Sequence, residues 1–265
     1  MKKKFLKGFT LVELIVVMAL MAILMAAMMQ LFRPIRATFV DSTAYESQRT
    51  VQNGMVRYIT ESIRYATDMG FYSSSVTDAV DKFSTKYIST YNIDSSKETA
   101  VKNAIKENAE IIIIDRKETY SSGVDGNTYK GRILRRKFAS GASLSDVAGS
   151  AGCRLALGNA YYGASDYSIT FSGAPDSGNI TDGIEVTVSS VMHDSLGGNS
   201  TVSNKGTALC LNLISGGLNL NGNAGVHSTN AGFFDKDNYT GLTDGQKLYI
   251  VFLNSDGKDK VLAVS

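Results

Sequence analysis

The longest hydrophobic stretch of the chain lies near its start, where the run from Phe9 to Met29 contains a single ionisable side chain, Glu13. As a helix rising about 1.5 Å per residue, this run spans roughly 30 Å, which is the thickness of a bilayer's hydrocarbon core. Lysines crowd the residues before it, at positions 2, 3, 4 and 7. Because positively charged flanks stay in the cytoplasm, the pattern predicts a membrane helix with the rest of the chain outside.

Farther along, the continuous apolar run gives way to a one-sided stripe. Apolar residues recur at spacings of three and four, at Val51, Met55, Ile59, Ile63 and Ala66. Charged residues occupy the other faces, so the stripe predicts an amphipathic helix that packs on a globular head. The two segments together predict one long helical spine.

Three sequence features predict an interruption of that spine. Pro34 lacks an N–H for the helical ladder, and Thr43 and Glu46 have the spacing of a capping box that can start a new helix. Gly54 costs about 1 kcal/mol relative to alanine inside a helix. We therefore expect a spine that is kinked or broken at Pro34 and ends at Met69-Gly70.

The rest of the chain has mainly strand-type patterns. Two short helices are expected over 79–91 and 97–108, followed by a β-branched strand at 110–114 that returns as a hairpin over 129–138. Further strands are expected at 154–157, 167–171, 183–191, 207–214 and 247–253. The sequence thus predicts an α+β fold, in which a long N-terminal helical spine packs on an antiparallel β-sheet head and no second domain is evident.

Composition narrows the possible functions. The net charge is only +2, although four lysines precede the membrane segment, so the exposed part of the chain is near neutral or slightly acidic. A nucleic-acid partner is not expected from this charge.

Glu13 is the unusual residue of the apolar run. A carboxylate within a membrane helix costs about 2.5–3.5 kcal/mol on insertion scales, so it requires a partner. If the chain were cut between Gly8 and Phe9, the new amine of Phe9 would lie one helical turn from Glu13. In a helical assembly, the amine of one subunit can equally neutralise Glu13 of its neighbour.

The run from Lys7 to Leu14, with the letters KGFTLVEL, closely resembles the prepilin processing site of type IV pilins and type II secretion pseudopilins. The resemblance implies that a prepilin peptidase cleaves after Gly8, that Phe9 is N-methylated, and that Glu13 registers neighbouring subunits. Other pilin subunits, an inner-membrane platform protein and an assembly ATPase are the partners it implies. It covers the N-terminal segment and is only architectural beyond it.

The same resemblance implies a layout of the whole chain. Residues 1–8 would be the leader peptide, 9–32 the transmembrane and filament-core helix, 33–69 its amphipathic continuation, and 70–265 an extracellular β-rich head. The precursor would cross the bacterial cell membrane once with its N-terminus in the cytoplasm, and the mature protein would join an extracellular or envelope-spanning filament. Its length, and the helix carrying Arg57 and Arg64, favour a minor subunit that is similar to J-type pseudopilins.

Three other interpretations of the N-terminal segment remain open. A secretory signal cut near Ala26-Ala27 would be unusually long and would contain Glu13. A plain signal anchor fits the length and charge but leaves Glu13 unexplained. A membrane-anchored binding or adhesin module that never polymerises predicts an uncleaved N-terminus and tolerance of Glu13→Ala.

The head contains weaker candidate sites. Cys153 and Cys210 can form one disulfide outside the cytoplasm, worth about 4 kcal/mol in the chain-entropy model, or remain two buried thiols. Their positions differ from the cysteines that close a C-terminal loop in many pilins. Acidic residues in two oxygen-rich segments are weak candidates for Ca²⁺, although neither segment matches an EF-hand loop and solvated turns are the preferred interpretation. These residues are Asp235, Asp237, Asp256 and Asp259.

Catalysis is not predicted. The chain has two histidines, His193 and His227, and the first stands directly before Asp194 and Ser195. Residues of a catalytic triad are brought together by the fold rather than by adjacency, so this run carries no catalytic prediction. Nucleophile-elbow, phosphate-loop and zinc-protease motifs are missing from the sequence. The tyrosines can line an adhesive face, but packing on the sheet or the helix is preferred.

Overall fold

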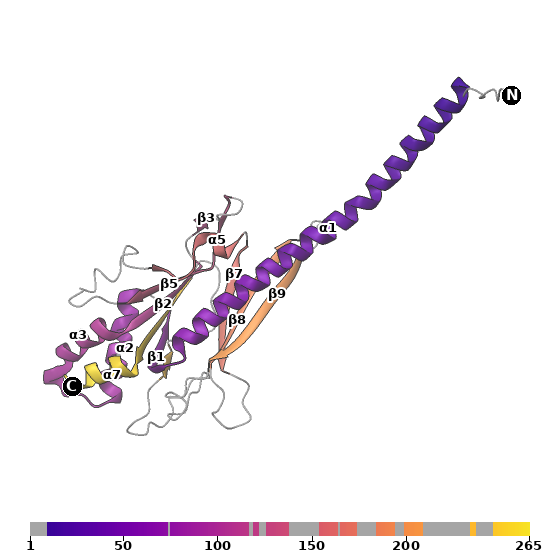
Figure 1. Ribbon diagram of the computed structural model, residues 1–265. Helices are drawn as coiled ribbons and strands as arrows, with labels where there is room; N and C mark the ends of the chain where they lie inside the picture. The colour runs from indigo at the N-terminus through magenta and orange to yellow at the C-terminus, as the bar shows by residue number, and fades with distance from the viewer. Residues whose placement is uncertain are drawn as a thin grey trace, which may run out of the picture.

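The computed structural model describes residues 10–73, 75–116, 119–121, 126–137, 154–163, 165–173, 184–193, 199–208, 234–236 and 246–265. A single long helix, α1 (Leu11–Ile63), projects from a head in which strands and short helices alternate (Figure 1). The predicted α+β fold is therefore confirmed. The other elements are β1 (Ala66–Tyr72), α2 (Val76–Thr90), η1 (Ser95–Lys97), α3 (Glu98–Asn108), β2 (Glu110–Asp115), β3 (Tyr120–Ser121), β4 (Thr128–Tyr129), β5 (Arg132–Lys137), β6 (Arg154–Leu155), α5 (Asn159–Tyr162), β7 (Tyr167–Gly173), β8 (Ile184–His193), β9 (Asn199–Ala208), β10 (Phe234–Lys236), β11 (Lys247–Asn254) and α7 (Ser255–Leu262).

A six-stranded sheet forms the middle layer of the head, in the order β10-β1-β11-β2-β5-β6. β1 and β10 pair in parallel, and the other neighbours pair antiparallel. In β2, Ile112 and Ile114 belong to the hydrophobic cluster on one face, whereas Ile111 and Ile113 belong to the cluster on the other. Because both faces are covered, this strand is a continuous apolar run rather than an alternating one.

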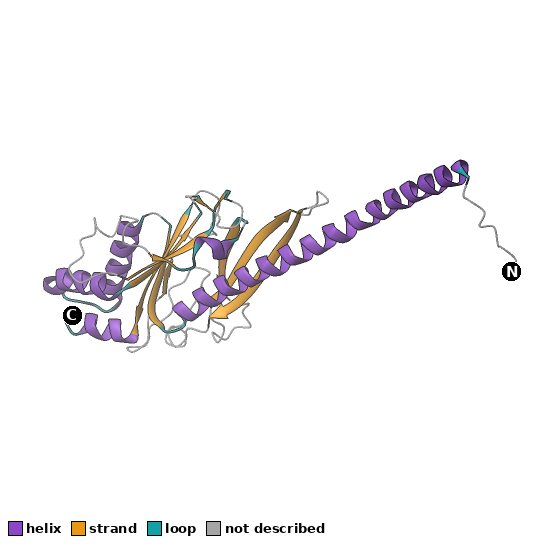
Figure 2. Ribbon diagram, turned by 45° about the horizontal axis from the view of Figure 1, so that its top comes forward, coloured by secondary structure: helices purple, strands orange, loops and turns teal. Residues whose placement is uncertain are grey.

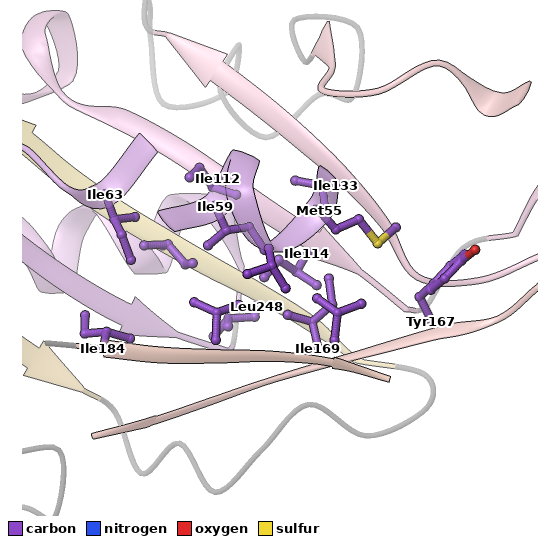
Figure 3. Close-up of a cluster of buried hydrophobic side chains, with 14 of the residues drawn as sticks. Met55, Ile59, Ile63, Ile112, Ile114, Ile133, Tyr167, Ile169, Ile184 and Leu248 are labelled. Atoms are coloured by element: carbon purple, nitrogen blue, oxygen red, sulfur yellow. The ribbon is translucent and has the colours of Figure 1, made fainter. Parts of the chain in front are cut away.

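One face of that sheet packs against the second half of α1. The helix contributes Met55, Ile59 and Ile63, all fully buried, and the second, three-stranded sheet β7-β8-β9 lies beside them (Figure 3). The sequence stripe on α1 is thus confirmed as the face that packs on the head, as far as Ile63.

The opposite face of the sheet is covered by α2, α3 and α7 (Figures 1 and 2). Phe83 and Tyr87 of α2 and Ile105 of α3 are fully buried there. α2 begins earlier than the expected start at 79, because the Ser75 side chain caps the helix by accepting a hydrogen bond from the N–H of Asp78. The two short helices predicted from the sequence are confirmed.

The sequence predicts a kink or a break at Pro34, and the break is wrong. α1 is one continuous helix with Pro34 inside it (Figure 2). The hydroxyl of Thr38 donates to the Pro34 carbonyl at 2.9 Å, and the hydroxyl of Thr43 donates to the Phe39 carbonyl at 2.9 Å. Thr43 therefore bonds back within the helix instead of capping a new one. A proline removes its own N–H bond from the ladder, and the turns on either side retain theirs.

The helix also ends earlier than Met69-Gly70. The residues from Ala66 to Tyr72 form β1, and all of them are buried. Met69 pairs with Phe252 and Gly70 with Val251 of β11, so the assigned boundary between 33–69 and 70–265 falls inside a strand. Helical spacing at Ala66 is overridden because this segment gains two strand neighbours, β11 and β10.

Most of the remaining strands agree with the sequence. β2 and β5 form the expected antiparallel pair, with Glu110 opposite Lys137, and strands occur where 154–157, 167–171, 183–191 and 247–253 were predicted. The strand expected at 207–214 is misplaced: β9 covers Asn199–Ala208, and 209–214 lie outside the described residues. Helix α7 was not predicted at all.

A close approach of α1 to β9 leads to a first prediction. A Cβ added at Gly206 would lie 2.3 Å from Cγ1 of Val56, in a buried β-branched side chain that has little room to move. Gly206→Ala should therefore lower the free energy of unfolding of the head by about 1–3 kcal/mol. Thermal unfolding of the full-length protein in detergent, followed by the near-ultraviolet circular dichroism of its tyrosines, measures this change.

Gly158→Ala is the matched control. Gly158 has φ −64° and ψ 153°, which alanine adopts freely, and apart from its chain neighbours no atom of the described residues lies within 4 Å of a Cβ added there. This substitution should leave the unfolding temperature unchanged or raise it slightly. Equal destabilisation by the two substitutions would contradict the described packing of α1 on β9.

Candidate functional site

The first turn of α1 holds Glu13 in a reciprocal capping arrangement. Thr10 is the N-cap residue, and its hydroxyl oxygen accepts from the N–H of Glu13 at 3.3 Å. In return, Oε2 of Glu13 accepts from the backbone N–H of Thr10 at 2.9 Å and from the Thr10 hydroxyl at 2.9 Å. The two residues thus satisfy each other across one turn of helix.

This arrangement answers part of the question that the sequence raised about Glu13. Two donors from Thr10 reduce the cost of keeping a carboxylate in an apolar segment, because a hydrogen-bonded polar group loses less on leaving water. The signal was present in the sequence: Thr10 and Glu13 have the S/T-x-x-E spacing of a capping box. Thr43 and Glu46 have the same spacing, but they lie inside α1, where the Thr43 hydroxyl donates to the Phe39 carbonyl instead of capping a helix.

The membrane-length part of α1 is not covered by the described part of the head. Among the described residues, one helix is long and apolar enough to cross a membrane, and its most hydrophobic window has a mean hydropathy of 2.7 with none of it buried. Leu11 is 78% exposed and Phe39 is 74% exposed. In water such a surface would be a large unpartnered apolar patch, so it requires lipid or another protein around it.

The second half of the same helix is joined to the head by polar as well as apolar contacts. The side-chain amide of Gln52, which is fully buried, donates to the hydroxyl of Ser190 at 2.9 Å and to the carbonyl of Val202 at 2.8 Å. Ser190 in turn donates to Oε1 of Gln48 at 3.0 Å. These directional bonds fix the rotation of α1 on β8 and β9, so the head and the spine form one unit.

Gly54 of α1 has a role that helix propensity alone does not reveal. The hydroxyl of Tyr161 would lie 1.7 Å from a Cβ added at Gly54, so the glycine makes room for the tyrosine ring. The same hydroxyl lies 3.4 Å from the Thr50 carbonyl. Among the other tyrosines of this region, Tyr120 and Tyr162 are almost fully buried, so they pack inside the head rather than line an adhesive face.

Several of the predicted site residues cannot be placed. The described part of the chain leaves out the cleavage residues Gly8 and Phe9, both cysteines at 153 and 210, and Asp237. Asp194 and Ser195 also lie outside it, as does His227, and His193 ends β8.

The three described acidic candidates for calcium lie in two different elements. Asp235 lies in β10, whereas Asp256 and Asp259 lie in helix α7 rather than in an open loop. Asp256 forms an ion pair with Lys260 at 2.7 Å. The described residues contain no group of three or more His, Cys, Asp or Glu side chains that lie close enough together to hold a metal ion.

Residues 6–29 match the family model described as the prokaryotic N-terminal methylation motif. The match includes the capping pair Thr10 and Glu13 and most of the uncovered apolar surface. No curated protein and no solved structure matches the chain.

Proposed function

We propose that this chain, which carries the N-terminal methylation motif of type IV pilins and pseudopilins, is a structural subunit of a type IV pilus or of a type II secretion-like pseudopilus. The motif supports a type IV pilin-like or pseudopilin precursor, and proteins with this motif are structural rather than enzymatic. The observation that carries the proposal is the uncovered apolar half of α1 with Glu13 in its first turn.

One surface serves both environments of such a subunit. Before assembly, lipid surrounds the apolar side chains of α1, and the Thr10 donors satisfy Glu13 within the subunit. In the filament, the apolar side chains of neighbouring helices replace lipid at similar free energy, because both are hydrocarbon. Glu13 then accepts the methylated amine of Phe9 from a neighbouring subunit, which sets the register.

The head moves with the helix during this transfer. The buried bonds of Gln52 to β8 and β9, together with the apolar packing of Ile59, hold the second half of α1 on the head. Force applied to the spine by a platform protein and an assembly ATPase therefore reaches the head through a packed interface. The topology that suits this mechanism has the lysine-rich N-terminus in the cytoplasm.

We further propose a minor rather than a major subunit, similar to J-type pseudopilins. The two arginines that suggested this role lie at the surface of α1. Arg57 pairs with Glu61 at 2.7 Å, and the guanidinium of Arg64 lies 5.8 Å from the centre of the Tyr65 ring. The proposal is tested by measuring the copy number of this chain relative to the other subunits in purified filaments. A minor subunit should have a small fraction of the copy number of the major subunit.

Processing of the N-terminus is the direct test of the function. Mass spectrometry of the protein from cells with an active prepilin peptidase should identify a chain that begins at N-methylated Phe9. Cells without the peptidase should yield a chain that retains Gly8. A side chain larger than hydrogen at position 8 should obstruct the peptidase, so Gly8→Glu should give the uncleaved chain in both cells.

The alternatives predict different masses. A non-polymerising membrane-anchored module retains residues 1–8 whether or not the peptidase is present. A secretory signal instead yields a chain cut near Ala27. Either result would contradict the filament proposal and leave an anchored or a secreted head domain.

A further inference from the structure

Three side chains that lie far apart in the sequence converge at one end of the head. Asp68 comes from β1, Tyr91 follows the last turn of α2, and Lys258 comes from α7. The Tyr91 hydroxyl donates to Oδ1 of Asp68 at 2.6 Å, and Nζ of Lys258 donates to the Tyr91 hydroxyl at 2.6 Å. The phenol therefore bridges an amine and a carboxylate in a continuous hydrogen-bonded chain.

The amine and the carboxylate are themselves close but not directly hydrogen-bonded. Nζ of Lys258 lies 3.6 Å from Oδ2 of Asp68, beyond the range of an N–H···O bond. The Asp68 side chain is fully buried and that of Lys258 is 12% exposed. A charged pair in such a site loses most of its hydration, and its attraction offsets that loss only when the geometry is ideal.

The bridging phenol offers a way to remove the charge. If Lys258 passes a proton to the Tyr91 oxygen while Tyr91 passes its own proton to Asp68, the result is a neutral amine, a carboxylic acid and an unchanged phenol. Burial and the neighbouring Asp68 carboxylate raise the pKa of Tyr91 above its ordinary value. The Tyr91 hydroxyl therefore stays protonated, and its proton can be transferred to Asp68 when Lys258 replaces it.

A neutral amine beside a carboxylic acid is the reactant pair for amide formation. We propose that Lys258 and Asp68 form a covalent amide cross-link within the folded head. The bond from Nζ to Cγ of Asp68 forms, and the bond from Cγ to Oδ1 breaks. Oδ1 leaves as water, taking the proton that Tyr91 delivered and one from the amine. No oxidant, reductant or cofactor is consumed.

Two further contacts suit this reaction. The hydroxyl of Thr67 lies 3.0 Å from Oδ2 of Asp68 and 3.0 Å from the carbonyl oxygen of Leu253. Its one proton can turn to Oδ2, the oxygen that gains negative charge when the amine adds. The amine is also held over the Tyr91 ring, 4.7 Å from its centre, which limits its motion. The amine of Lys258 is thus held 3.6 Å from an oxygen of the Asp68 carboxyl group. Holding two reactants this close has the same effect on the rate as a very high concentration of free reagent.

The cross-link would join two functionally distinct ends of the head. β1 directly follows the helical spine, and α7 follows β11, the central strand that pairs with β1. A covalent bond here would keep the strand that receives force from α1 attached to the C-terminal helix. This proposal does not depend on filament assembly, so either can fail without the other.

Peptide mass spectrometry of the full-length protein tests the cross-link. The protein is purified from membranes of cells without prepilin peptidase, so that leader removal does not change its mass, and it is kept folded in detergent before digestion. Trypsin should release residues 65–82 joined to residues 248–260, lighter than the two peptides together by one water molecule. Trypsin should not cut after Lys258 in the joined species.

Matched variants distinguish amide formation from mere closeness of the two side chains. Asp68→Asn should still cross-link but should lose ammonia instead of water. Lys258→Arg should abolish the joined peptide, because a guanidinium remains protonated and does not attack. Tyr91→Phe keeps the ring over Tyr87 and Lys258 but removes the relay, so the joined fraction should fall at least tenfold at early times.

The near-ultraviolet circular dichroism of each variant shows whether its head is folded. A folded wild-type chain whose two peptides stay separate after prolonged incubation would overturn the proposal. So would a joined peptide that survives in Lys258→Arg, since another residue would then be the donor.

Discussion

Glu13→Ala is expected to abolish incorporation of the protein into filaments while leaving the precursor in the membrane with a folded head. Alanine removes the carboxylate that accepts the Thr10 donors and that would accept the amine of a neighbouring Phe9. Alanine is also less costly to keep in lipid than a carboxylate, so extraction from the membrane loses a driving force. The fraction of the chain in sheared filaments, compared with the membrane fraction, should fall to background.

Glu61→Ala is the matched control on the same helix. Glu61 is 60% exposed and pairs with Arg57 on the surface, an interaction worth about 0–1 kcal/mol. Its removal should leave filament incorporation unchanged. Normal incorporation of Glu13→Ala would favour the membrane-anchored module that never polymerises.

Glu13→Gln separates the two roles of the side chain. Glutamine keeps an oxygen that accepts from Thr10, so the helix N-terminus stays capped, but it carries no charge for the amine. We expect assembly to be lost as it is in Glu13→Ala. Assembly that survives in Glu13→Gln would show that the cap to Thr10, and not the ion pair with Phe9, is what assembly requires.

Ile59→Ala should destabilise the head strongly without affecting membrane insertion. Ile59 is fully buried between the six-stranded sheet and the three-stranded sheet (Figure 3). Truncation to alanine in such a site typically costs about 2–5 kcal/mol, because it removes buried methyl groups and leaves a cavity. Chemical denaturation of the full-length protein in detergent, followed by the near-ultraviolet signal of its tyrosines, should show this loss.

Ile15→Ala makes the same chemical change on the same helix. Ile15 is 57% exposed in the subunit and belongs to the uncovered apolar half of α1. The substitution should leave unfolding of the head unchanged, and any effect should appear in the filament, where neighbouring helices cover this position. Equal destabilisation of the head by the two substitutions would contradict the division of α1 into a free half and a packed half.

The features of the N-terminal segment could be determined from the sequence because they depend on local chemistry. An apolar run of membrane length, a basic tip and a capping pair act within a few residues of one another, so no knowledge of the head is required. The stripe through Met55 and Ile59 likewise follows from the helical period. The two short helices and the β2–β5 hairpin were predictable for the same reason.

Other features were decided only by the tertiary structure. Ala66–Tyr72 became a strand because β11 and β10 supply its hydrogen-bond partners from the far end of the chain. α1 is continuous through Pro34, where local rules predict a kink or a break. Helix propensity also could not predict that the Tyr161 side chain occupies the space where a side chain at position 54 would lie.

The same distinction applies to the candidate sites. Thr10 and Glu13 are three positions apart, and their spacing specifies the contact between them. Asp68 and Lys258 meet only because β1 pairs with β11 and α7 packs against α3, where Lys258 reaches Tyr91 at the end of α2. Local periodicity determines which residues share a face of one element, but burial and pairing between distant segments determine which faces meet.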